Sequence, residues 1–166
     1  MTVNIHASCV VLARAGEAFG APPDAGILLI GESGAGKSDL ALRLIAAGAQ
    51  LVADDRVDLS VENTRLIARP PAPLAGLIEI RNVGIVTLPH APEAPIALVV
   101  QLGTAENLPR LPEREQYQPP SGIDLAAKSR PPLIRLSALE PSAPAKIAAA
   151  AAAFAHALFR DAATPN

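Results

Sequence analysis

Aromatic side chains and excess positive charge are both scarce in this chain of 166 residues, and each shortage argues against a nucleic-acid partner. Phe, Tyr and Trp make up 2% of the residues, so the sequence offers few stacking surfaces for single-stranded nucleic acids. The formal net charge is −2, which gives no cationic surface for a phosphate backbone. We therefore expect the protein to bind no nucleic acid.

Paired cysteines and long apolar runs are also missing. The single cysteine, Cys9, has no partner for an intramolecular disulfide, and no Cys-x-x-Cys pair predicts a thiolate metal site. No run approaches the ~18 apolar residues of a membrane-spanning helix. The first residues, MTVNIHASCVVLAR, lack the cationic start of a signal peptide. These absences predict a cytoplasmic protein with no membrane partner.

The apolar residues that are present, 50% of the chain, predict one domain over residues 1–166. Residues 103–131 are rich in proline and charge, which predicts a long mobile loop that we consider a candidate lid or docking surface. The 77–88 segment leaves its secondary structure open. Periodicity predicts strands at 3–12, 26–31, 50–55, 96–102 and 132–136, a hairpin at 57–69, and helices at 38–47 and about 144–160. The fold class is α/β, with a mixed, largely buried sheet flanked by helices.

A glycine-rich loop, GESGAGKS, lies between the predicted strand 26–31 and the predicted helix 38–47. It fits G-x-x-x-x-G-K-[ST], in which backbone N–H groups at a helix start surround phosphate oxygens. Lys37 would reach the β- and γ-phosphates and Ser38 would bind Mg²⁺. The alternative is a glycine turn with a surface lysine. The predicted nucleotide-binding residues are Gly31, Glu32, Ser33, Gly34, Ala35, Gly36, Lys37 and Ser38.

Two adjacent carboxylates, Asp54 and Asp55, end the predicted strand 50–55. Successive strand residues point to opposite faces, so we expect one to face the phosphates, as a metal ligand or a proton acceptor, while the other supports it. A polar turn that opens the following hairpin is the alternative.

Three further polar residues are candidates. Glu79 and Arg81 share a face if their segment is extended, which suits a metal ligand beside a phosphate clamp or, alternatively, a solvated ion pair. His6 lies among apolar residues, where a structural histidine is the alternative to a functional one.

Four segments in order, IHASCV, LLIGESGAGKSDLALRL, LVADDRV and LIEIRNVGIV, resemble the catalytic domain of the HPr kinase/phosphorylase family. The resemblance implies an ATP- and Mg²⁺-dependent cytoplasmic kinase that phosphorylates a serine of HPr, the phosphocarrier protein of the sugar phosphotransferase system. It also implies a reverse reaction with inorganic phosphate. Hexamers in this family imply that the chain can self-associate.

The resemblance assigns roles to matching residues. Lys37 would be catalytic, and Ser38 and Glu79 would bind Mg²⁺. Asp55 would accept the serine proton during phosphorylation and return it during dephosphorylation. His6 would be the active-site histidine of the family, and Asp54 and Arg81 would support the site.

Two family features are not matched. An arginine that longer members carry in a mobile loop has no counterpart near Tyr117, so Arg114 is the candidate substitute. A segment associated with dephosphorylation is not recognisable after residue 132, which leaves the phosphorylase activity in doubt. A small-molecule kinase and a non-catalytic ATP-binding regulatory module are the alternative functions.

Overall fold

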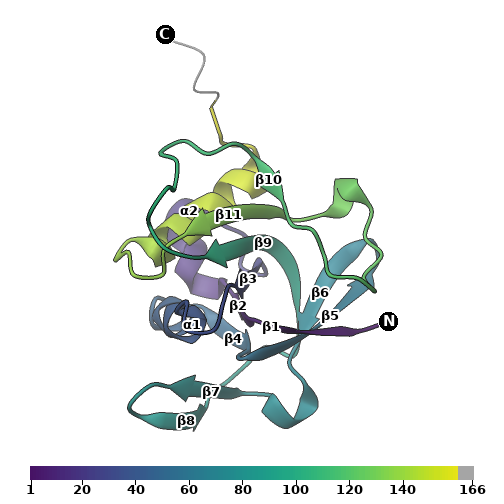
Figure 1. The fold of residues 1–166 in the computed structure, drawn as a ribbon, viewed down its shortest axis with the longest axis vertical. Helices are drawn as coiled ribbons and strands as arrows, with labels where there is room; N and C mark the ends of the chain where they lie inside the picture. Colours follow the sequence, from purple (N-terminus) through teal and green to yellow (C-terminus); the bar gives the residue numbers. More distant parts are fainter. Residues whose placement is uncertain (161–166) are drawn as a thin grey trace.

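The computed structural model describes residues 1–160, whose strands form a nine-stranded sheet and a separate two-stranded hairpin (Figure 1). The large sheet contains β1 (Val3–His6), β2 (Ser8–Val11), β3 (Gly26–Ile30), β4 (Gln50–Ala53), β5 (Arg56–Glu62), β6 (Arg65–Arg69), β9 (Ala94–Leu102), β10 (Glu115–Gln116) and β11 (Pro132–Leu136). The hairpin contains β7 (Leu77–Ile80) and β8 (Gly84–Thr87). The helices are α1 (Lys37–Ala46) and α2 (Ala143–His156), with short 3₁₀ helices at Ala13–Phe19, Ala72–Leu74 and Ala127–Ser129.

The large sheet is mixed, as the sequence predicts. Its main strand order is β1-β5-β6-β9-β3-β2-β4, and β11 lies beside β9 with β10 outside it. The β3 and β11 strands pair with β9 in parallel, and the other pairs are antiparallel. The nine-residue β9 joins the antiparallel part of the sheet to its parallel part. Its first residues pair with β6 in antiparallel fashion, and its last residues pair with β11 in parallel.

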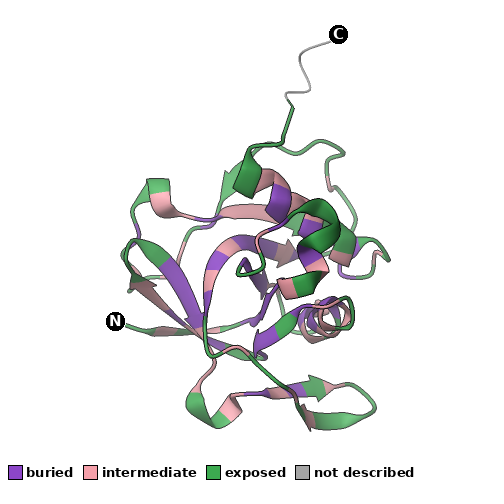
Figure 2. Ribbon diagram, turned by 180° about the vertical axis from the view of Figure 1, so that it is seen from behind, coloured by how far each residue is buried: buried purple, intermediate pink, exposed green. Residues whose placement is uncertain are grey.

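Each face of this sheet buries its own apolar core. On one face, Ile27 and Leu29 of β3 pack with Leu40 and Leu44 of α1, and α2 belongs to the same core. On the other face, Leu28 packs with residues of β5 and β6, because successive strand residues point to opposite sides. Figure 2 shows the buried residues gathered in these central strands. The expected sheet flanked by helices is therefore corrected: α1 and α2 cover one face, and the antiparallel half of the curled sheet closes the other.

Local sequence explains two of the elements. The α1 helix begins directly after Gly36, which adopts the left-handed φ of 96°, and its buried face contains Leu40 and Leu44. In the β5–β6 hairpin, Asn63 and Thr64 have φ values of 49° and 64°, which suit a two-residue turn whose twist matches that of the flanking strands. The predicted hairpin at 57–69 is confirmed.

Several predicted boundaries are wrong. The strand expected over 3–12 divides at Ala7, because β1 pairs with β5 whereas β2 pairs with β3 and β4. The C-terminal helix ends at His156 rather than near 160, because Ala157 takes a left-handed φ of 52°. The segment 103–131 is not a continuous loop: it contains β10 and buries Tyr117 and Leu125 in the second core. The segment 77–88, left open above, is the β7–β8 hairpin.

Among residues 1–160, no helix is both long and apolar enough to cross a lipid bilayer.

Candidate functional site

A cleft of about 580 Å³ opens at the start of α1, where β1, β2 and the hairpin approach the glycine loop. The predicted site residues that line it are His6, Ser33, Gly34, Gly36, Lys37, Ser38, Asp55, Glu79 and Arg81. Gly31, Glu32, Ala35 and Asp54 are outside this lining. Residues separated by more than seventy positions in the chain therefore meet at one surface.

The glycine loop has the backbone that its sequence requires. Gly34 and Gly36 have φ values of 84° and 96°, which are strained for residues with a side chain. A Cβ on Gly36 would also lie 2.8 Å from the Cβ of Ala138, so the loop has no room for it. The loop leads directly into α1, whose first N–H groups and dipole favour a bound anion.

Lys37 is buried within this loop. Its Nζ donates hydrogen bonds to the carbonyl oxygens of Gly31 and Glu32, both at 2.8 Å. Burial lowers the pKa of Lys37, and the negative charges of Asp55 and Asp54 oppose that shift. The lysine therefore has local hydrogen-bond acceptors and two nearby carboxylates.

Asp54 is the centre of a hydrogen-bond network beneath the residues that line the cleft. The residue is 4% exposed. Its Oδ1 accepts the hydroxyl protons of Ser8 at 2.8 Å and Ser38 at 2.7 Å. Its Oδ2 accepts the backbone N–H of Glu79 at 3.2 Å. Asp54 thus connects β2, the start of α1 and the β7–β8 hairpin.

Asp55 points elsewhere because it adopts a left-handed φ of 68° immediately after Asp54. Its side chain is 65% exposed and lines the cleft. The Nδ1 atom of His6 lies 3.4 Å from Asp55 Oδ1, so the imidazole and the carboxylate face each other. The two adjacent aspartates therefore occupy different environments: Asp54 is buried and accepts three hydrogen bonds, whereas Asp55 is open to the cleft.

Glu79 and Arg81 belong to the hairpin side of the cleft, and both side chains are exposed. Among the described residues, no ion pair links Glu79 to Arg81. The carboxylate of Glu79 and the hydroxyl of Ser38 line the same cleft and supply oxygen donors. Within residues 1–160, no group of three or more His, Cys, Asp or Glu residues forms a metal cage. This sparse oxygen set suits Mg²⁺, which keeps several waters and binds phosphates alongside one or two protein ligands.

Ser8 is a polar residue of the site that the sequence patterns did not single out. Its side chain is fully buried, lines the cleft and bonds to Asp54, which lies 46 positions further along the chain. Ser8 lies two residues after His6, and in one continuous strand the two side chains would share a face. Because the strand breaks at Ala7, this alternation does not reliably place Ser8 beside His6.

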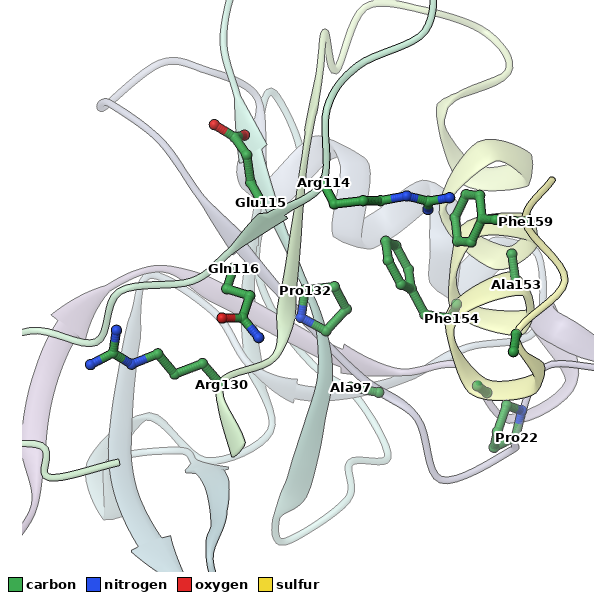
Figure 3. Close-up of a pocket in the computed structure, with 13 residues that line it drawn as sticks. Pro22, Ala97, Arg114, Glu115, Gln116, Arg130, Pro132, Ala153, Phe154 and Phe159 are labelled. Carbon is green, nitrogen blue, oxygen red and sulfur yellow. The ribbon is translucent and has the colours of Figure 1, made fainter. Parts of the chain in front are cut away.

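Arg114 does not lie at this cleft. Its guanidinium stacks 3.4 Å from the ring centroid of Phe159 and 5.7 Å from that of Phe154. These three residues line a different pocket, of about 570 Å³, between α2 and the β10–β11 pair (Figure 3). The expectation that Arg114 replaces the family's loop arginine is corrected. No residue of 103–131 lines the cleft either, so this structure does not place that segment as its lid.

Comparison with known proteins relates this site to one family. Residues 23–129 match the family model of the HPr Serine kinase C-terminal domain. The chain belongs to this family. An HPr kinase/phosphorylase from Polaromonas is 35% identical over 121 residues, which cover 68% of this chain and 38% of the relative. The corresponding protein of Clostridium tetani is 48% identical over 64 residues, covering 39% of this chain and 21% of the relative.

The fold of this family member also matches a solved structure. The Hpr(Ser) kinase/phosphatase from Coxiella burnetii is similar with a TM-score of 0.66 and 27% sequence identity. The match covers 88% of this chain and 86% of that chain. The chain spans about two fifths or less of the length of the Polaromonas and Clostridium tetani relatives.

Proposed function

We propose that this domain transfers the γ-phosphoryl group of ATP to a serine hydroxyl of an HPr-like phosphocarrier protein in the cytoplasm. The observation that carries the proposal is the juxtaposition of the glycine loop with Asp55 in one cleft. The loop supplies phosphate-binding amides, and the open carboxylate supplies a proton acceptor. The names of the relatives, which refer to HPr kinase, support HPr as the acceptor.

In this proposal the loop and Lys37 hold the phosphates. Backbone amides at the start of α1 and the ammonium group of Lys37 face the charge of the transferring phosphoryl group. Lys37 would exchange its hydrogen bonds to Gly31 and Glu32 for phosphate oxygens. The serine oxygen of the acceptor attacks the γ-phosphorus, the bond to the β-phosphate oxygen breaks, and ADP leaves.

Asp55 would accept the proton of the attacking hydroxyl. Its carboxylate is open to the cleft, and His6 lies close enough to orient it. Asp54 is unsuited to this role because three donors already occupy its buried carboxylate. In this proposal Asp55 therefore transfers the proton, and Asp54 positions the groups around it.

Ser38 and Glu79 would hold Mg²⁺. A serine hydroxyl has one donor and two lone pairs, so Ser38 can donate to Asp54 and still offer a lone pair to a cation. When bound, Mg²⁺ neutralises charge on the β- and γ-phosphates. Arg81, on the same hairpin, would add positive charge near the phosphates.

Incubation with γ-labelled ATP, Mg²⁺ and a purified HPr-like protein tests the proposal. We expect label on a serine of the acceptor, identified by mass spectrometry. Label on a metabolite, in a parallel incubation with candidate metabolites, would indicate a small-molecule kinase, and unaltered ATP in both incubations would indicate a nucleotide-binding regulatory module. Addition of inorganic phosphate to the labelled product tests the phosphorylase reaction, and light scattering during gel filtration tests self-association.

A further inference from the structure

We infer that Ser8 is a positioning residue that holds Asp54 so that the start of α1 and the β7–β8 hairpin keep their relative positions across the cleft. The inference rests on the proposed function for its catalytic consequence, although the geometry can be tested in the protein alone. It gives a role to a residue that lies outside the glycine loop and outside the predicted metal-binding and proton-transfer sets.

The Ser8 hydroxyl has one proton, and that proton is donated to Asp54 Oδ1 at 2.8 Å. Both groups are buried, with Ser8 at 0% and Asp54 at 4% exposure, so water cannot readily replace either partner. An unpaired polar group in such a place is costly, which fixes the carboxylate in the orientation that satisfies all its donors. Ser8 thereby sets the plane of the Asp54 carboxylate.

That plane determines what the other two donors can reach. Ser38 uses the same oxygen as Ser8, and the Glu79 N–H uses the other oxygen. Removal of the Ser8 hydroxyl leaves the carboxylate free to rotate toward Ser38, which weakens its bond to Glu79. The hairpin would then be held less firmly, because β7 and β8 pair only with each other among the described strands.

The Glu79 amide is well placed for this contact. The N–H of Leu88 bonds to the carbonyl of Gly76, which places Leu77 and Glu79 at the non-hydrogen-bonded positions of the β7–β8 ladder. The N–H of Glu79 therefore points away from β8 and toward Asp54. Asp54 holds the backbone of one proposed cation ligand and the hydroxyl of the other, and Ser8 holds Asp54.

Hydrogen exchange at the Glu79 amide, measured by NMR on the protein without nucleotide or metal, tests the positioning. We expect Ser8→Ala to increase that exchange rate by at least about tenfold, because a hydrogen bond to a charged group is weakened. Cys9→Ala is the matched control: Cys9 is the next residue of β2 and is equally buried, and its thiol donates to the carbonyl of Val10 and not to Asp54. We expect it to leave the Glu79 rate within about twofold of wild type. An unchanged rate at Glu79 in Ser8→Ala overturns the inference.

The catalytic consequence is measured separately as the Mg²⁺ dependence of phosphoryl transfer. Ser8→Ala should raise the Mg²⁺ concentration for half-maximal rate several-fold while lowering the rate at saturating Mg²⁺ much less, about twofold. A merely structural residue would lower the folded fraction without moving the Mg²⁺ requirement, and that result also overturns the inference.

Thermal melting checks that each variant folds. If Ser8→Ala does not, Ser8→Cys, which retains a weak donor of similar size, carries both measurements with smaller expected changes in the same direction. If wild type transfers nothing to the acceptor, the proposed function fails, whereas the exchange result still decides the role of Ser8.

Discussion

Ser38 donates its only hydroxyl proton to Asp54 across 2.7 Å, and this fixes the direction in which the oxygen lone pairs point. Asp54 thus accepts hydrogen bonds from three segments that are distant in the chain. These hydrogen bonds offset the cost of burying the polar carboxylate away from water.

Asp54→Asn replaces one carboxylate oxygen by an NH₂ group, so at least one of the three donors meets another donor. We expect the free energy of unfolding to fall by about 1–3 kcal/mol, the cost of a buried unsatisfied polar group. Urea denaturation measures it. Asp24→Asn, at an exposed loop position, should change the urea midpoint very little. An unchanged midpoint in Asp54→Asn would show that the network contributes nothing to stability.

Asp55→Asn should fold normally, because asparagine tolerates the left-handed φ of 68° at this position. If Asp55 accepts the serine proton, the rate of phosphoryl transfer should fall about 10²–10⁴-fold. ATP binding, measured by calorimetry, should change little, since the glycine loop is untouched. Transfer at the wild-type rate would exclude Asp55 as the proton acceptor.

Lys37→Ala removes the ammonium group from the glycine loop. We expect a loss of transfer of about 10²–10³-fold or more, because a group that stabilises the transferring phosphoryl charge is removed. Lys128→Ala is the control, since Lys128 is exposed and outside the cleft. Equal activity of the two variants would indicate that the loop is not the site of transfer.

The Glu62–Arg69 ion pair on the β5–β6 hairpin gives an expected pH dependence. A hydrogen bond from Arg69 is the main cause that lowers the pKa of Glu62 from its ordinary 4.5. A carboxyl group with a lowered folded pKa stabilises the protein above its unfolded pKa, and this contribution is lost as the pH falls through the folded value. The difference in melting temperature between wild type and Arg69→Gln should therefore be present at pH 7 and shrink below about pH 4.5. A difference that stays constant down to pH 3 contradicts this assignment.

Arg114→Ala tests the placement of that side chain against Phe154 and Phe159. Loss of the cation–π contact should lower the free energy of unfolding by about 0.5–2 kcal/mol. Phosphoryl transfer should remain within about twofold of wild type, because Arg114 does not line the cleft. A fall of more than about tenfold would restore Arg114 as a candidate for the loop arginine.

Local patterns in the sequence predict the strand–loop–helix unit and the β5–β6 hairpin well, since glycine spacing, apolar periodicity and turn residues act over short distances. The glycine loop, Asp55 and Glu79 are identifiable for the same reason, because each lies in a short motif. The roles of these residues remain predictions until the variants above are measured.

Two of the features that the sequence does not predict depend on distant contacts, and a third depends on one local backbone conformation. The break at Ala7 follows from the curl of the sheet, which gives β1 and β2 different partners. The bond between Ser8 and Asp54 joins positions 46 residues apart, and no local pattern encodes it. The end of α2 at His156 depends on the backbone of one alanine, although the alanine-rich sequence favours a longer helix.

The β7–β8 hairpin forms its own small sheet, and Ile78 is the one residue of its two strands that is buried. A chimaera that takes residues 77–87 from a relative but keeps isoleucine at position 78 should keep the nine-stranded scaffold and alter the wall of the cleft that Glu79, Ile80 and Arg81 supply. Substitutions in this hairpin could then change which acceptor the cleft binds, while the buried cores of the large sheet remain unchanged.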